Sequence, residues 1–181
     1  MKLLESVYNK IVNEEESSSN TDSHEIMTAC LCMMPLNKIN KVIDSISGTK
    51  YAENMPKVLA ELSKIAYSRK IISASDKEKE SIMTFKNKEL ALVQACSAAR
   101  EILERSKFGK VDHVILTGKK WVPEISMFSG IRNLEEFFKI NSYGMKDFNS
   151  SDIVLVGKAG NKTKFLGVSL KKKKRIDLVQ L

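Results

Sequence analysis

The spacing of apolar residues along this chain changes after about residue 106, and that change most limits the folds it can adopt. Up to about residue 106, apolar residues recur every three or four positions, which is the period of an amphipathic helix. From Val111 to Thr117, and again from Asp152 onward, β-branched and alternating residues predict strands. This order predicts an α+β fold with a helical N-terminal half, followed by a small, mainly antiparallel sheet with flanking helices.

The predicted helices are separated by polar, glycine or proline breaks. One of Thr21, Asp22 or Ser23 supplies an N-cap for a helix that stops before Pro35. A single domain is expected, helical over about residues 1–110 and β-rich over about 111–181. The capped helix should run to about Met34, and the other predicted helical ranges are 2–13, 36–47, 53–69, 76–85, 87–106 and 131–140.

Charge and cysteine content narrow the class of protein. The net charge of +8 favours polyanionic partners, among which nucleic acid is the commonest. Three cysteines, two of them within the apolar run 29–34, are typical of buried thiols in a reducing compartment. No apolar run approaches the roughly 20 residues that span a bilayer. We therefore expect no membrane partner and a cytoplasmic protein, in the host cytoplasm if it is viral; its oligomeric state stays open.

Residues 152–172 predict a β-hairpin. The first strand runs from Asp152 to about residue 156, and the second from about Thr163 to Lys172. The turn lies within 157–162 and is centred near Gly160, since glycine tolerates a positive φ. Alternation along the second strand places Phe165, Gly167, Ser169 and Lys171 on one face, and Leu166, Val168 and Leu170 on the face that packs on helices.

The register of this hairpin decides whether its polar residues meet. With this turn, Asp152 falls opposite residues 167 to 169, and pairing with 167 or 169 places its carboxylate on the face of Ser169 and Lys171. A slip by one residue would move Asp152 to the other face. An acid beside a lysine suits phosphodiester cleavage, because a carboxylate can hold a divalent cation and a lysine can orient the attacking water.

These residues resemble the PD-(D/E)xK nuclease superfamily. Ser151-Asp152 is similar to its first half-motif, and Ser169-Leu-Lys171 is similar to its second, with serine in place of the usual acid. The resemblance implies a restriction-endonuclease-like core and an Mg²⁺- or Mn²⁺-dependent endonuclease, and some phage-encoded members have a similar strand. The family core continues beyond the lysine strand, whereas only residues 176–181 follow here. The resemblance therefore implies either a piece of a longer chain or an incomplete or permuted fold.

The same resemblance assigns roles to individual residues. Asp152 would bind the metal, helped by the carbonyl of Val168 or Leu170, and Lys171 would orient the water beside Ser169. Because Ser169 leaves the metal one ligand short, a helix acid would complete the site. Glu25 is the first candidate, at the start of an apolar helix, and Glu89 is the second, at the start of the helix before the first strand.

Two readings without catalysis remain open. One is an inactive nucleic-acid-binding protein or phage virion or assembly component on the same scaffold, and the other is a helical protein-interaction module with a basic tail. Basic residues of the turn and tail would contact the DNA or RNA backbone in a salt-dependent way, without reading sequence. These residues are Lys158, Lys162, Lys164, Lys172, Lys173, Lys174 and Arg175.

Overall fold

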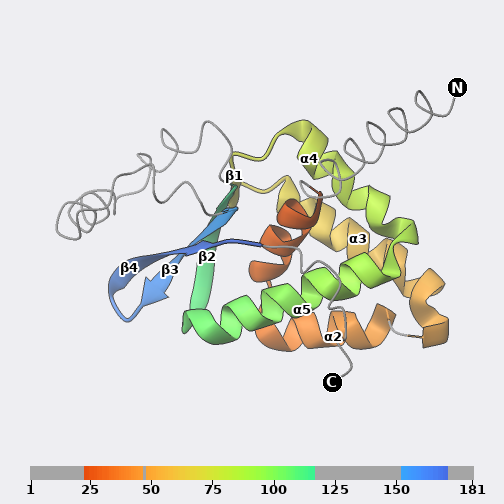
Figure 1. Ribbon diagram of the computed structural model, residues 1–181, viewed down its shortest axis with the longest axis horizontal. Coiled ribbons are helices and arrows are strands. Elements are labelled where there is room, and N and C mark those ends of the chain that lie inside the picture. The colour runs from red at the N-terminus through yellow and green to blue at the C-terminus, as the bar shows by residue number, and fades with distance from the viewer. Residues whose placement is uncertain (1–22, 47, 117–151, 171–181) are drawn as a thin grey trace, which may run out of the picture.

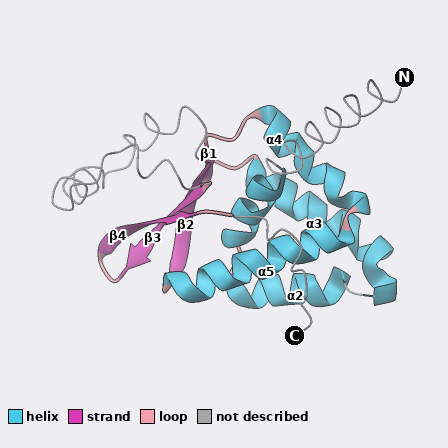
Figure 2. Ribbon diagram, viewed as in Figure 1, coloured by secondary structure: helices cyan, strands magenta, loops and turns pink. Residues whose placement is uncertain are grey.

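The computed structural model describes residues 23–46, 48–116 and 152–170. Helices form one layer, and a four-stranded sheet lies along one side of it (Figures 1 and 2). The predicted α+β class with a helical N-terminal half is therefore confirmed. Four predicted features lie outside the described residues: the helices over 2–13 and 131–140, the loop over 141–151, and the basic tail from Lys171 to Arg175.

The helical elements follow the apolar periodicity closely. The first described helix covers 23–32. The others are α2 (Leu36–Ile46), the 3₁₀ turn η1 (Gly48–Lys50), α3 (Tyr51–Ala66), α4 (Asp76–Ser81), the 3₁₀ helix η2 (Ile82–Asn87) and α5 (Glu89–Ser106).

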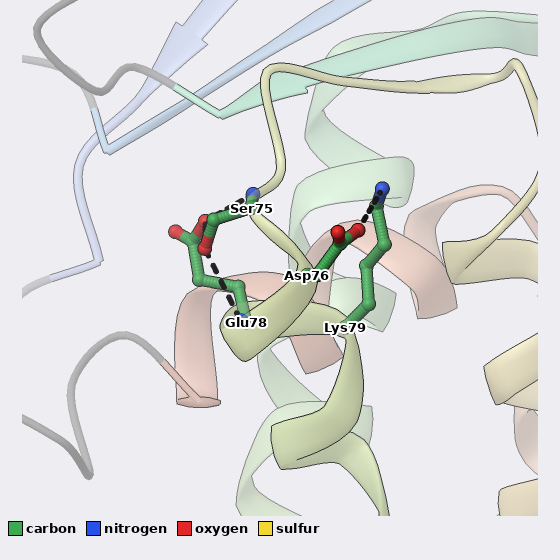
Figure 3. Close-up of polar contacts among 4 residues, drawn as sticks. All are labelled: Ser75, Asp76, Glu78 and Lys79. Carbon is green, nitrogen blue, oxygen red and sulfur yellow. Dashed lines mark hydrogen bonds and ion pairs between the residues drawn. The ribbon is translucent and has the colours of Figure 1, made fainter.

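A capping box starts α4 (Figure 3). The hydroxyl of Ser75 accepts a hydrogen bond from the Glu78 N–H at 3.2 Å, and the Glu78 carboxylate accepts one from the Ser75 N–H at 2.6 Å. Both bonds satisfy backbone groups that a helix start leaves without an intrahelical partner. The helix is short and continues as η2, so the predicted segment 76–85 is divided between two helix types.

The strands are β1 (Ile71–Ile72), β2 (Lys110–Leu116), β3 (Ile153–Ala159) and β4 (Lys162–Val168), in the spatial order β1-β2-β3-β4. β1 is parallel to β2, and the other neighbours are antiparallel. The sheet is thus mainly antiparallel, as predicted, with β4 at one edge and the very short β1 at the other.

The two faces of the sheet differ. Leu166, Val168 and Leu170 pack against the helical core, which confirms the face predicted from alternation. Val114 and Leu155, which are paired across β2 and β3, belong to the same core. The other face carries Ile115, Val154 and Val156, which are buried but are not part of the helical core cluster.

The hairpin turn forms where the sequence predicted it. Ala159 pairs with Lys162, so Gly160 and Asn161 make a two-residue turn, and Gly160 has a φ of 62°. β4 ends at Val168 and not at the predicted Lys172. The reason is that β3 begins only at Ile153, so the ladder has no further backbone partner to offer.

The connection between α5 and β2 is tight. Lys107 ends α5 in the left-handed conformation, with a φ of 54°. The Ser106 hydroxyl donates to the Leu103 carbonyl at 2.9 Å and accepts from the Phe108 N–H at 3.3 Å. These bonds turn the chain directly from the helix into the sheet, and the end of α5 lies beside the start of β2 (Figure 1).

Candidate nucleic-acid interface

Asp152 lies where the hairpin register was predicted to place it. The Asp152 N–H donates to the Val168 carbonyl at 2.8 Å, and Ile153 pairs with Val168. The next position along the ladder therefore sets Asp152 opposite Ser169. The Ser169 hydroxyl donates to the Asp152 Oδ2 atom at 3.3 Å. The register that joins these two side chains is confirmed.

The Asp152 carboxylate closes the end of the hairpin. Its Oδ2 atom also accepts a hydrogen bond from the Leu170 N–H. This amide comes just after β4 ends, so the side chain takes the place of a backbone acceptor. One oxygen thus receives two donors, and the Val168 carbonyl, a predicted metal ligand, already accepts from the Asp152 N–H. The Asp152 carboxylate therefore acts here as a hydrogen-bond acceptor that holds the chain just after β4 against the start of β3.

The predicted helix acids lie on separate helices. Glu25 is half-buried on the helix 23–32 and takes part in a contact of its own. Glu89 is exposed at the first residue of α5, and that end of α5 lies away from the sheet (Figure 1). Burial and then the charge of Glu89 raise the pKa of Tyr51, which places Glu89 near the start of α3. The structure thus does not bring Glu89 to Asp152.

Within the described ranges, no group of three or more His, Cys, Asp or Glu side chains could hold a metal ion. Lys171, the predicted water-orienting residue, lies outside those ranges. The Mg²⁺ or Mn²⁺ site therefore stays a prediction, with Asp152 and Ser169 as the part of it that is brought together.

The opposite end of the hairpin is rich in lysine. Lys158, Lys162 and Lys164, all predicted to bind nucleic acid, are exposed on the two strands that flank the turn. Lys110, on β2, pairs directly with Lys158, and Lys107 ends the helix that leads into β2. We call these five exposed residues the lysine surface: Lys107, Lys110, Lys158, Lys162 and Lys164.

The lysine surface covers both sides of this end of the sheet. By alternation, Lys110 and Lys158 share a face with Val156, whereas Lys162 and Lys164 lie on the side of the helices. The Lys164 Nζ atom lies 5.8 Å from the centre of the Phe108 ring, within the range of a cation–π contact. The five positive charges therefore spread around the turn in place of forming one flat row.

The lysine surface has no acidic counterpart among the described residues. Ion pairs occur elsewhere, on the helices: Lys79 with Asp76 at 3.2 Å, Arg105 with Glu101 at 2.7 Å, and Lys38 with Glu61. None of the five lysines forms an ion pair with a carboxylate in the described part of the chain. Two like charges directly opposite on neighbouring strands, as at Lys110 and Lys158, are destabilising, so this arrangement is not explained by stability.

Lys107 and Lys110 were not predicted as site residues. Both lie far from the hairpin in sequence, and only the pairing of β2 with β3 brings them to it. The sequence Lys107-Phe-Gly-Lys110 did contain a signal, since two lysines flank an aromatic residue and a glycine just before a predicted strand.

The three cysteines are free and buried, as predicted. Burial raises the pKa of Cys32 and Cys96 from the ordinary 9.0 to about 12. Burial, and then the neighbouring Cys32, raise the pKa of Cys30 to about 12. Since a thiol reacts as its thiolate, these side chains are unreactive core residues near neutral pH.

Comparison of the chain with family models, with curated proteins and with solved structures finds no match in any of the three. The restriction-endonuclease-like core therefore stays a prediction that rests on the hairpin residues. Among the described residues, no helix has the length and apolar character needed to cross a membrane.

Proposed function

We propose that this protein binds nucleic acid through the lysine surface, by contacts to the phosphate backbone that do not read the base sequence. The observation that supports the proposal is the convergence of five exposed lysines without carboxylate partners at one end of the sheet. Lysine ammonium groups bind phosphates and release condensed counterions, which drives such binding.

The arrangement of the lysines suits a chain of phosphates better than a single anion. Lys162 and Lys164 are two residues apart on one strand, a rise of about 7 Å. Lys110 and Lys158 extend the positive charge across two further strands. The net charge of +8 adds a long-range attraction for polyanions.

A salt titration tests the proposal. The full chain is mixed with a labelled duplex and with a labelled single strand, and the affinity is measured by fluorescence anisotropy at several salt concentrations. We expect log affinity to fall linearly with log salt. Substitution of Lys158, Lys162 and Lys164 by Ala should lower the duplex slope by about 2.7, or roughly 0.9 for each lost phosphate contact.

A matched control removes the same charge elsewhere. Lys57, Lys64 and Lys77 are exposed on α3 and α4, and their triple alanine variant should keep the slope of the unmodified chain. Binding without a salt slope, or an equal loss in the control variant, would contradict the proposal.

A metal-dependent nuclease is the second candidate function. It is supported by the contact between Asp152 and Ser169, which lies two residues before Lys171 in the sequence. In this role Asp152 would bind Mg²⁺ or Mn²⁺ with Glu25, and Lys171 would orient the water. A cleavage assay on DNA and RNA, with and without divalent cation, tests it. Cleavage that persists in both Asp152→Ala and Lys171→Ala, or no metal-dependent cleavage at all, argues against this function.

A further inference from the structure

A pocket of about 480 Å³ opens beside the lysine surface. It is bounded by the end of the helix 23–32, the start of α2, the end of α5 and the start of β2. Its volume lies within the range of ligand pockets, which is about 300–1,000 Å³. The apolar side chains that line it include Met33, Met34, Leu36, Leu103, Phe108 and Val111.

Two residues belong to both the pocket and its basic surroundings. Lys110 is a member of the lysine surface and also lines the pocket. Phe108 also lines the pocket, and the Lys164 ammonium group lies over its ring. The same ring lies against Gly157, where a Cβ would come within 3.0 Å of it. The pocket and the lysine surface are therefore contiguous, and a ligand could contact both.

We propose that this pocket takes an unstacked base of a single-stranded nucleic acid whose phosphates lie on the lysine surface. The inference rests on the proposed function and adds a preference for single strands. A base has apolar faces that suit the methionine, leucine and phenylalanine walls. Its polar edge can reach Lys110 and the backbone at the start of α2. A duplex keeps its bases stacked, so it can use only the lysines.

Gly109 offers a way to fill the pocket without removing a lysine. It lines the pocket, and a Cβ added to it meets no atom within 4 Å. Gly109→Phe therefore introduces a ring at the pocket wall while the five lysines stay in place. Leu36→Trp, at a half-buried lining position, is the second blocking variant in case the first does not fold. Ala60→Phe, at an exposed position of α3, is the control.

The experiment compares three probes: a single-stranded oligonucleotide carrying 2-aminopurine, an oligonucleotide of the same length with abasic sites, and a duplex. We expect the 2-aminopurine fluorescence to change when the unmodified chain and Ala60→Phe bind. In the blocking variants that change should be lost. Their affinity for the single strand should fall by about 5- to 150-fold, the contribution of one stacked base, and their affinity for the abasic strand and duplex should be unchanged.

The outcomes separate this inference from the proposed function. If no probe binds even at low salt, both are overturned. If all probes bind with a salt slope, but the blocking variants keep the fluorescence change and the affinity, only the base pocket is overturned. The inference is also overturned if 8-anilinonaphthalene-1-sulfonate binds the unmodified chain, is lost in Gly109→Phe and is not displaced by the single strand, since the pocket would then take an amphiphilic anion.

Discussion

The helical layer and the lysine surface differ in the contacts that their charged side chains make. On the helices, Lys79, Arg105 and Lys38 each lie beside a carboxylate, and the thiols among them stay neutral because burial raises the pKa of each to about 12. Near the hairpin turn, Lys110 lies opposite Lys158, and none of the five lysines forms an ion pair with a carboxylate among the described residues. Ion pairs thus occur on the helices, whereas like charges face each other across β2 and β3.

The hairpin β3–β4 shows both kinds of contact, one at each of its ends. At one end, the carboxylate of Asp152 accepts from both Ser169 and Leu170, and at the other end Lys158 faces Lys110. The hairpin is thus held by side-chain hydrogen bonds at the Asp152 end, whereas two positive charges lie opposite each other at the Lys158 end. We therefore expect substitutions at the two ends of the hairpin to have separate effects, on stability at Asp152 and on the proposed binding at Lys158.

Alkaline pH should have the largest effect, by lowering the free energy of unfolding through the buried thiols of the helical layer. Because burial raises the pKa of Cys30, Cys32 and Cys96 from 9.0 to about 12, the folded chain keeps three protons that the unfolded chain loses in this interval. Their stabilisation is complete below pH 9 and is lost as the pH rises toward 12. Urea unfolding should show a loss on the order of 1 kcal/mol per thiol by about pH 10.

The control for the alkaline experiment is the triple variant Cys30→Ala, Cys32→Ala and Cys96→Ala. Its free energy of unfolding will be lower at neutral pH, because buried volume is lost, but it should fall less steeply between about pH 9 and about pH 10. An equal slope in this variant and in the unmodified chain would rule out the thiols as the cause.

Gly157→Ala should destabilise the contact between β3 and the segment that leads from α5 into β2. A Cβ at this position would lie 2.7 Å from the Lys110 carbonyl oxygen and 3.0 Å from the Phe108 ring, so the backbone of β2 must move. We expect a loss of about 1–3 kcal/mol in the free energy of unfolding. Gly109→Ala is the control, since its Cβ meets nothing within 4 Å. Equal midpoints in urea for both variants would contradict the close contact.

Asp152→Ala should loosen the anchored end of the hairpin. It leaves the Leu170 N–H without its acceptor, which costs about 1–2 kcal/mol for a partly buried group. Asp152→Asn keeps an acceptor oxygen and should lose less. Hydrogen exchange of the Leu170 amide measures this directly and should become faster in Asp152→Ala. Unchanged exchange in the alanine variant would show that the carboxylate does not hold this amide.

Thr28→Val should remove an exception within the helical layer. The Thr28 hydroxyl is buried and has no hydrogen-bond partner in the structure as described. Valine has nearly the same shape and leaves no unsatisfied oxygen, so the free energy of unfolding should rise by up to about 1 kcal/mol. Thr84→Val is the control, because the Thr84 hydroxyl is exposed and donates to the Ser81 carbonyl at 2.6 Å. A loss of stability in Thr28→Val would indicate a hydrogen bond of that hydroxyl.

Lys158→Thr should have the smallest effect on stability and sharpen the lysine side of the comparison. It removes the like charge opposite Lys110, so we expect a gain of no more than about 0.5 kcal/mol. Affinity for nucleic acid should fall in the same variant. Lys162→Thr, whose partner across the strands is Ala159, should lower affinity without the gain. A clear loss of stability in Lys158→Thr would show that Lys158 has a structural role.

Local patterns in the sequence predicted much of this structure. The alternation of Leu166, Val168 and Leu170 predicted the buried face, and Gly160 predicted the turn, whereas the register that sets Asp152 beside Ser169 was one of those the sequence left open. Both features depend on residues within a short stretch of chain, where turn geometry and side-chain direction are linked. The helix positions could be predicted because the apolar period of a helix is also a local pattern in the sequence.

Other features depend on contacts between distant segments. β1 has only Ile71 and Ile72, and pairing with Val114 and Ile115 is what defines it as a strand. Lys110 enters the lysine surface only through its pairing with Lys158. The predicted roles of Glu25 and Glu89 required a tertiary placement that apolar periodicity does not encode, so the sequence could not show whether either acid lies near Asp152.

The position of β4 at the edge of the sheet has a consequence for behaviour in concentrated solution. An edge strand offers unpaired amide and carbonyl groups to any other extended chain, and charged side chains discourage such pairing. Lys162 and Lys164 lie on this edge strand, next to the turn. These lysines therefore discourage two copies of the sheet from pairing edge to edge, and we expect that neutralising them would favour aggregation.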